Sequence, residues 1–290
     1  MPTPIILCAD DYALSPGVSA AIRTLILHGR LGATSCMTLS PHWPAEGAHL
    51  RTLRGRADIG LHLTLTHMPP LGPMRRLAPS GRLPGLGRLA TMAYCRILDR
   101  SEIRDEIIRQ IDAFERVVDA PPAYIDGHLH VHQLPIVRAE VLAAIQSRLA
   151  GRAVWLRVCD EPLAAIWRRR VTPLRAAVVS VMGSGLRRQA AALGVPVNPR
   201  FAGVNDFART IPYREIFQRF LSEAPPGLLV MCHPGNAEPE LVAADPVVER
   251  RDDEFAYLSG DALMADLAAA GCVLTRFSDV AGQEKSFASD

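Results

Sequence analysis

The chain has 290 residues, which is long enough for one large α/β domain or two small ones. Hydrophobic residues make up 49% of it and charged residues 21%, so the composition excludes global disorder. The formal net charge of +2 gives no overall basic surface, and we therefore expect no nucleic-acid partner.

The six cysteines are scattered and form no CxxC pair, which is typical of buried free thiols in a cytosolic protein. The first apolar run, Ile5 to Ala9, is short and ends in two aspartates, unlike a secretion signal. No stretch approaches the roughly 20 apolar residues of a membrane span. These features predict a soluble cytoplasmic protein.

Strand-like and helix-like segments alternate through the first 65 residues. Residues 4–9 predict a strand, and a helix follows with Ser15 as N-cap and Pro16 at its first position, ending near His28. We further expect strands at 33–39 and 57–65, with a helix over 43–54 between them.

A long irregular stretch comes next. Residues 66–90 are rich in proline, glycine and arginine and show no periodicity, which predicts a long loop or a small lid. We take residues 66–100 as an insertion near the site. A clear helix then covers 101–118, with Ser101 as its cap and one apolar face, and 123–126 predicts a strand.

The second half continues the alternation. We expect helices over 135–149, 212–223 and 259–270, the last capped by Ser259, and strands over 154–158, 196–201, 227–232 and 272–275. Residues 161–194 differ because they are helical and strongly basic, and we take them as a helical insertion. Residues 281–290 resemble a frayed tail.

About seven strands alternate with helices, a pattern that predicts a parallel sheet with both faces covered. We expect a single-domain, TIM-like, irregular (β/α) barrel, since polar residues gather just after the strands. A doubly wound open sheet is the alternative. No GxGxxG motif follows a strand, so a dinucleotide site has no support.

Acidic or imidazole side chains stand at the ends of three apolar runs. They are Asp10 and Asp11, then His62, then Asp126, His128, His130 and His132. Such groups are costly to bury halfway without a function. If the three ends meet, they form an Asp/His/His metal site with a second carboxylate beside it, which indicates metal-assisted hydrolysis.

Each of these residues also has a plainer interpretation. An aspartate pair can cap a helix, a lone strand histidine can be a core residue, and the histidine run can be a polar loop. His233 follows another apolar run in Cys232-His233-Pro234-Gly235, where a fixed imidazole would suit general acid chemistry.

Four segments resemble motifs of the YdjC-like carbohydrate deacetylases, which include chitooligosaccharide and hopanoid-associated deacetylases. The segments are Ala9–Ser15, Gly60–Thr66, Ile125–His132 and Met231–Gly235, in family order. This resemblance implies an irregular (β/α) barrel that removes N-acetyl groups from amino sugars with a divalent metal. Two departures, Tyr12-Ala13 for the usual phenylalanine-glycine and Gly127 with Leu129 for the usual serine and histidine, hint at a subfamily with its own substrate.

The resemblance also implies a role for each candidate residue. Asp11, His62 and His128 would bind the metal, Asp10 would be the general base, His233 the proton donor and Arg157 a further site residue, with Asp126, His130 and His132 behind the ligands. Mixed Asp/His ligation suits Zn²⁺, although Mg²⁺, Mn²⁺ or Co²⁺ could serve.

The expected substrate is an N-acetylated amino sugar, in an oligosaccharide or a glycolipid, which releases acetate. The basic 161–194 stretch is either a solvated helix face or a contact with an anionic membrane, at its inner face. A homodimer is compatible with the sequence. Two other functions stay open: a metal-dependent phosphoesterase or amidohydrolase on a similar barrel, and a sugar-binding protein without turnover.

Overall fold

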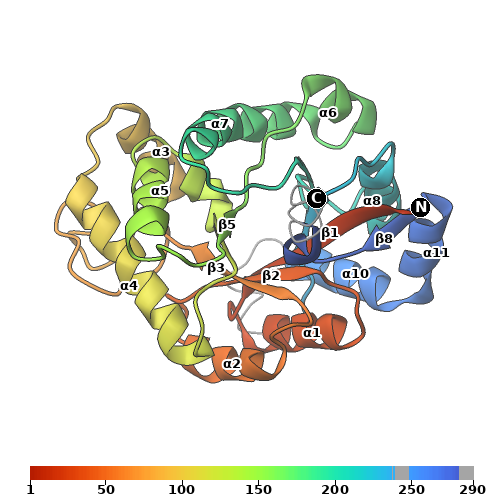
Figure 1. Cartoon of the computed structure of the whole chain (residues 1–290), viewed down its shortest axis with the longest axis horizontal. Coiled ribbons are helices and arrows are strands. Elements are labelled where there is room, and N and C mark those ends of the chain that lie inside the picture. Colours follow the sequence, from red (N-terminus) through yellow and green to blue (C-terminus); the bar gives the residue numbers. More distant parts are fainter. Residues whose placement is uncertain (237, 239–247, 281–290) are drawn as a thin grey trace, which may run out of the picture.

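The structure is a computed structural model that describes residues 1–236, 238 and 248–280. One parallel sheet forms its centre, and the helices surround that sheet (Figure 1). The strands in the described ranges are β1 (Thr3–Tyr12), β2 (Ala33–Cys36), β3 (Asp58–Leu63), β4 (Tyr124–Gly127), β5 (Trp155–Leu156), β6 (Arg200–Ala202), β7 (Leu228–Cys232) and β8 (Cys272–Leu274).

The sheet has the strand order β5-β4-β3-β2-β1-β7-β6, and β8 pairs with the start of β1. Its two outer strands curl toward each other: the Leu156 N–H donates to the Pro196 carbonyl at 2.9 Å, and Leu156 forms a parallel bridge with Val197. This confirms the irregular barrel that the alternation predicted and excludes the open doubly wound sheet.

Ten helices are described outside the sheet. They are α1 (Pro16–Leu27), α2 (Trp43–His49), α3 (Leu86–Tyr94), α4 (Arg100–Val118), α5 (Val137–Ser147), α6 (Leu163–Arg169), α7 (Pro173–Ala192), α8 (Tyr213–Leu221), α10 (Val248–Ser259) and α11 (Asp261–Ala269). Short 3₁₀ turns cover Leu50–Thr52 and His128–Gln133. Within these described ranges, no helix has the length and apolar character needed to cross a membrane.

The caps were predicted with mixed success. Ser15 accepts a hydrogen bond from the Val18 N–H, as expected for the N-cap of α1. The Ser101 prediction was wrong, because Asp99 accepts the backbone N–H groups at the start of α4. The Ser259 prediction was also wrong: Ser259 ends α10, a helix that the sequence analysis missed, and Gly260 precedes α11.

Alternate residues of β1 face opposite sides of the sheet. Ile6 and Cys8 belong to a cluster inside the barrel, whereas Ile5 and Leu7 pack in the larger core under the helices. Inside the barrel, the Tyr124 ring stacks on Trp155 at 4.1 Å. This aromatic layer fills the lower interior, and Asp10 follows Ile6 and Cys8 in the inward-facing series.

All six cysteines are free thiols. Five of them are buried, which agrees with the prediction from their apolar surroundings. Cys95 is the exception, since it is exposed at the C-terminal end of α3. The predicted frayed tail, 281–290, lies outside the described residues.

Candidate metal and catalytic site

A β-bulge lets two adjacent carboxylates enter one site. The β1–β2 register runs from Ala9↔Thr34 to Tyr12↔Cys36, so β1 holds one residue more than β2 between these pairs. Asp11, within the bulge, has a left-handed backbone with φ 65°. A regular strand would send neighbouring side chains to opposite faces, and the bulge turns Asp11 back toward the site.

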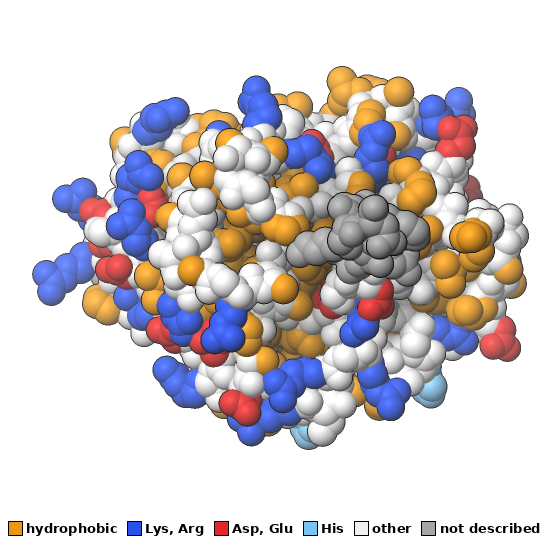
Figure 2. Space-filling model, viewed as in Figure 1, with side chains coloured by type: hydrophobic (Ala, Val, Ile, Leu, Met, Phe, Trp, Pro, Cys, Tyr) orange, Lys and Arg blue, Asp and Glu red, His pale blue; other side chains and the backbone are white. Residues whose placement is uncertain are grey.

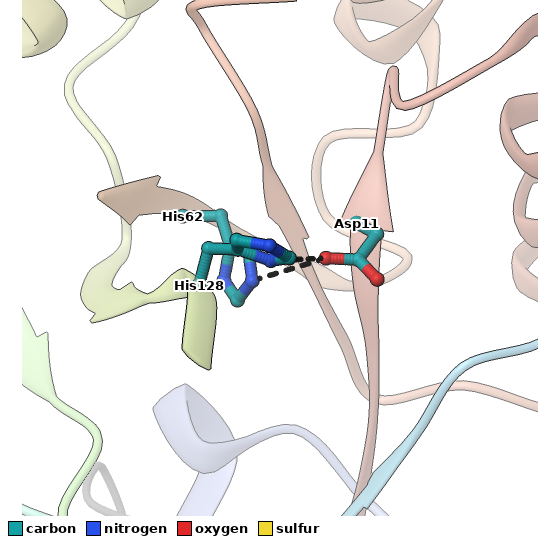
Figure 3. A group of neighbouring side chains, drawn as sticks. All are labelled: Asp11, His62 and His128. Atoms are coloured by element: carbon teal, nitrogen blue, oxygen red, sulfur yellow. Dashed lines mark hydrogen bonds and ion pairs between the residues drawn. The ribbon is translucent and has the colours of Figure 1, made fainter. Parts of the chain in front are cut away.

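Asp11, His62 and His128 converge from three strand ends (Figure 3). Asp11 Oδ1 lies 3.3 Å from His62 Nε2 and 3.1 Å from His128 Nδ1. One donor atom from each residue lies within 4.8 Å of the other two. A carboxylate and two imidazoles at this spacing fit a divalent cation with positions left open, the pattern of catalytic rather than structural zinc sites.

The support behind His62 also fits a metal ligand. Its Nδ1 pairs with Asp126 Oδ1 at 2.6 Å, which leaves Nε2 to face Asp11. Burial alone would lower the pKa of His62, but Asp126 and Asp10 raise it to about 10. Without a cation, the protonated His62 imidazole therefore supplies the positive charge at the centre of the site.

A second group of possible ligands, Cys8, Asp10 and Asp126, does not fit a cation. Burial raises the pKa of the Cys8 thiol far above its ordinary value, so the sulfur stays protonated. The guanidinium of Arg157 already lies between the carboxylates, with Nη1 2.5 Å from Asp10 Oδ1 and 3.0 Å from Asp126 Oδ2.

Asp10 is held in one orientation by charged and polar neighbours. Arg157 forms a two-pronged contact with it, because Nη2 also donates to Asp10 Oδ2 at 2.8 Å, and the Ser35 hydroxyl donates to Oδ1 at 3.1 Å. Burial raises the pKa of Asp10, but Arg157 and His62 outweigh it and hold that pKa below its usual range. Asp10 is therefore ionised at neutral pH.

His233 follows β7 and completes this side of the site. Its Nε2 lies 4.0 Å from Asp10 Oδ2, the same distance that separates this oxygen from His62 Nε2. The His233 ring meets the Phe207 ring edge to face at 5.1 Å, and its backbone N–H donates to Glu254 Oε2 at 2.5 Å. Burial lowers the pKa of His233 to about 4, so its resting form is the neutral imidazole.

His132 lies behind the site and His130 lines the cleft, and neither belongs to the group of three possible ligands. His132 Nε2 bonds to the Arg157 carbonyl at 2.9 Å, and His130 Nδ1 contacts Cys159 Sγ at 3.5 Å. The chain turns after Gly127, with left-handed backbone at Leu129 and His130, so the histidines no longer share one strand face. A Cβ on Gly127 would meet His132 Nδ1 at 2.9 Å, which leaves room for glycine alone.

The sequence analysis missed three residues that hold the site. Arg251 of α10 lies 2.6 Å from Asp11 Oδ2 and helps to keep the pKa of that buried carboxyl low. Glu254 of the same helix binds the His233 backbone, and Ser35 of β2 binds Asp10. The first two belong to a charged segment with no apolar run, so strand-end patterns could not reveal them.

The site opens into a cleft of about 990 Å³. Asp10 and four histidines (His62, His128, His130 and His233) line it together with many apolar side chains. Many of these apolar side chains come from α3 (Leu86, Ala90 and Tyr94) and from α6 and α7 (Leu163, Leu174, Val178, Val181 and Met182). Figure 2 shows hydrophobic side chains in the hollow near the centre of this face. Parts of the 66–100 and 161–194 segments thus border the site.

Fold and site together define an irregular (β/α) barrel whose polar centre lies at the C-terminal ends of its strands. Within that class, the chain belongs to the YdjC-like family, whose model, described as YdjC-like protein, matches residues 4–269. The resemblance seen in four short motifs therefore extends over nearly the whole chain.

Two curated relatives carry the name chitooligosaccharide deacetylase. The Serratia marcescens protein is 34% identical over 145 residues, which cover 50% of this chain and 56% of that protein, so the chain matches about half of its length. The Yersinia pestis protein is 26% identical over 276 residues, covering 95% of this chain and 98% of that protein.

A solved structure supports the fold. A crystal structure from Enterococcus faecalis V583, of a protein provisionally called a cellobiose-phosphate cleavage protein, superposes with a TM-score of 0.72. It covers 97% of this chain and 99% of that chain at 18% sequence identity. At this identity the likeness establishes the barrel and nothing about the reaction.

Proposed function

We propose that this protein is a metal-dependent hydrolase that removes the N-acetyl group from an amino sugar. The observation that carries the proposal is the convergence of Asp11, His62 and His128. His233 and the ionised Asp10 lie beside them. Family membership and the names of the two relatives support deacetylation as the reaction.

The chain supplies a group for each proton that moves. A divalent cation held by Asp11, His62 and His128 would polarise the amide carbonyl and acidify water, with Zn²⁺ the best match to the donor set. Asp10 Oδ2, turned toward His62 and His233, accepts the proton of the attacking water. The neutral His233 Nε2, 4.0 Å from this oxygen, takes up the proton that Asp10 has accepted and passes it to the sugar nitrogen as the C–N bond breaks, so acetate and a free amine result.

Arg157 acts on this reaction through Asp10. Its two-pronged contact fixes the carboxylate and keeps it ionised, while Asp126 pairs with both His62 and Arg157. One buried network of charges therefore links the proposed base to a proposed ligand, and Asp126 and Arg157 are positioning residues.

The apolar cleft favours a glycolipid over a plain oligosaccharide as the substrate. Aliphatic side chains of α3, α6 and α7 line the approach to the polar site, and such surface gains free energy by covering an alkyl group. We expect the octyl glycoside of N-acetylglucosamine to have a higher kcat/KM than N,N′-diacetylchitobiose. Equal values for the two compounds would contradict this preference.

Acetate release tests the reaction itself. The purified protein is treated with chelator, reloaded with Zn²⁺, Mg²⁺, Mn²⁺ or Co²⁺, and assayed with both compounds. We expect activity only after reloading, and a loss of kcat of at least 100-fold in Asp10→Asn with metal binding retained. The matched control is Asp58→Asn, a buried carboxylate at the far end of β3 that binds Ser278.

The same assay separates the competing functions. A phosphoesterase would release phosphate from aryl phosphates instead of acetate, and an amidohydrolase with another specificity would cleave other amides. A sugar-binding protein would bind these compounds, measured by calorimetry, without turnover under any metal. Either outcome would overturn the deacetylase proposal.

A further inference from the structure

Five large apolar side chains on α6 and α7 point into solvent. They are Leu163, Trp167, Leu174, Val178 and Val181, each between 52% and 73% exposed, and we call them the α6–α7 face. Scattered apolar residues are normal on a protein surface, but a contiguous group on two adjoining helices marks an interaction surface.

The spacing on α7 shows that the exposure follows a pattern. Leu174, Val178 and Val181 are four and three residues apart and form one stripe along the helix. On the other side of α7, Val179 and Leu186 are buried against the rest of the chain. The helix therefore has two apolar sides, and no described residue covers the outer one.

Positive charge accompanies this face. Residues 161–194 contain six arginines and one glutamate. Arg175 and Arg188 are exposed, and among the described residues no carboxylate lies within ion-pair distance of either. Arg188 lies seven residues after Val181, so it continues the stripe. The Arg175 guanidinium lies over the Phe207 ring, 5.6 Å from its centroid, so its charge is not neutralised. Apolar side chains flanked by arginines that have no carboxylate partner complement an anionic lipid surface, where the arginines meet headgroups and the apolar groups enter the interface.

The α6–α7 face lies directly beside the cleft that leads to the site. Leu163, Leu174, Val178 and Val181 are both exposed and part of the cleft wall, so the face continues directly into the cleft. The hollow with its hydrophobic lining lies beside α7 in Figure 2. A bilayer resting on the α6–α7 face would bring the cleft mouth to the level of the lipid headgroups.

We propose that the α6–α7 face docks on the surface of an anionic bilayer. Trp167 makes the contact measurable, because it is 52% exposed whereas the other two tryptophans, Trp43 and Trp155, are buried. Contact with lipid moves the emission of an exposed tryptophan to shorter wavelength, and an indole at the interface prefers this environment.

The test mixes the chelated protein with vesicles of phosphatidylcholine alone or with phosphatidylglycerol. We expect co-sedimentation with the anionic vesicles at least ten-fold above that with the neutral ones, reduced by 0.5 M NaCl. Tryptophan emission should shift to shorter wavelength and be quenched by doxyl-labelled lipid. Trp167→Phe should still sediment but lose most of this optical change.

A triple variant, Leu174→Ser/Val178→Ser/Val181→Ser, should reduce the bound fraction at least ten-fold. The matched control is Leu27→Ser/Met264→Ser, which alters exposed apolar residues of α1 and α11 that do not line the cleft and should bind like the unaltered protein. Circular dichroism and thermal melting would check that both variants are folded.

Three results would overturn the proposal: no sedimentation with anionic vesicles, equal losses in the triple variant and its control, or a dimer in gel filtration that the triple variant dissociates. The last result would assign the face to a second copy of the chain. The vesicle assay uses chelated protein and no sugar, so a negative result does not bear on the deacetylase proposal. A negative result in the acetate assay likewise does not bear on docking to the bilayer.

Discussion

Asp11 holds the site together through an unusual backbone conformation. Its φ of 65° is uncommon outside glycine, although aspartate tolerates it better than most residues. Strain of this kind costs on the order of 1–3 kcal/mol and persists where surrounding contacts enforce it. Here Asp11 Oδ1 faces His62 and His128 while Oδ2 pairs with Arg251, so the turned backbone lets one carboxylate connect three elements.

Asp126 should control metal affinity although it is not a ligand. In Asp126→Asn the partner of His62 Nδ1 becomes neutral, so the ring is a weaker donor to a cation. We expect about a 10- to 100-fold loss of Zn²⁺ affinity in a competition titration with a fluorescent chelator. Asp58→Asn, on the same strand as His62, should bind as tightly as the unaltered chain; equal affinities for all three proteins would contradict the role of Asp126.

Glu254 should make stability fall as the pH rises. Burial raises its pKa from 4.5 to about 7, although the His233 N–H and the positive charges of Arg251 and Arg250 oppose the shift. The folded state thus binds the proton more tightly than the unfolded chain. This contribution is complete below about pH 4.5 and is lost as the pH rises through about 7, for a total on the order of 3 kcal/mol.

Urea unfolding of chelated protein at several values between pH 5 and pH 8 measures this effect. Glu254→Gln cannot ionise, so the unaltered chain should lose stability relative to the variant across this interval. Parallel pH profiles for the two proteins would show that Glu254 does not titrate in this range.

Several residues of the site were within reach of sequence reasoning and others were not. Asp10, Asp11, His62 and His128 stand at the ends of apolar strands, and parallel strands bring such ends to one face. Arg251 and Glu254 come from α10, whose first turns are dominated by charge and whose approach angle depends on packing with α8 and α11. No local sequence pattern predicts the angle at which α10 approaches the site.

At the scale of elements, the contact between β3 and β4 depends on the absence of a side chain. A Cβ on Gly60 would lie only 2.4 Å from the Tyr124 ring. That ring stacks on Trp155 at 4.1 Å, and its hydroxyl lies 3.0 Å from Cys8 Sγ, so it cannot easily move away. The inward-facing rings of Tyr124 in β4 and Trp155 in β5 thus require a glycine at position 60 of β3.

Gly60→Ala should therefore destabilise the fold. We expect a loss of about 1–3 kcal/mol in the free energy of unfolding from urea titration, the usual cost of overpacking a core. Gly87→Ala in α3 is the matched control, since nothing lies within 4 Å of its added Cβ and alanine favours a helix. If Gly60→Ala were as stable as the control, the aromatic rings would be able to shift and make room for the added methyl group.

The elements themselves were mostly predictable because their signals are local. Ser15 with Pro16 and the apolar face of 101–118 depend on contacts within one turn or one helix. The errors arose where two signals lay side by side: Asp99 and Ser101 can both cap α4, and the structure uses the carboxylate. Helix α3 escaped notice because prolines and glycines dominate the residues before it.

At the scale of the whole molecule, the sequence predicted the barrel but not how it closes. The alternation of strands and helices and the polar strand ends were sufficient for the fold class. Closure depends on contacts between the segment before β6 and the β5 edge, where Asn198 bonds to both the N–H and the carbonyl of Val158. That pairing joins residues 40 positions apart and leaves no periodic trace.

The cleft likewise emerges only from the assembled chain. Helices α3 and α7 are separated by some 80 residues, yet both contribute apolar side chains to the wall above Asp10. The sequence showed a proline-rich stretch and a basic stretch, but it did not show that the two stretches border one cleft. The size of the cleft and its apolar lining are therefore properties of the tertiary structure.

Cys95 offers a practical use of the native chain. Five thiols are buried, so a maleimide reagent under native conditions should reach this one sulfur. Cys95 directly follows Tyr94, a residue of the cleft wall. A single fluorophore or spin label can thus be attached at the cleft rim without any substitution, and its signal would report whether an added lipid or sugar enters.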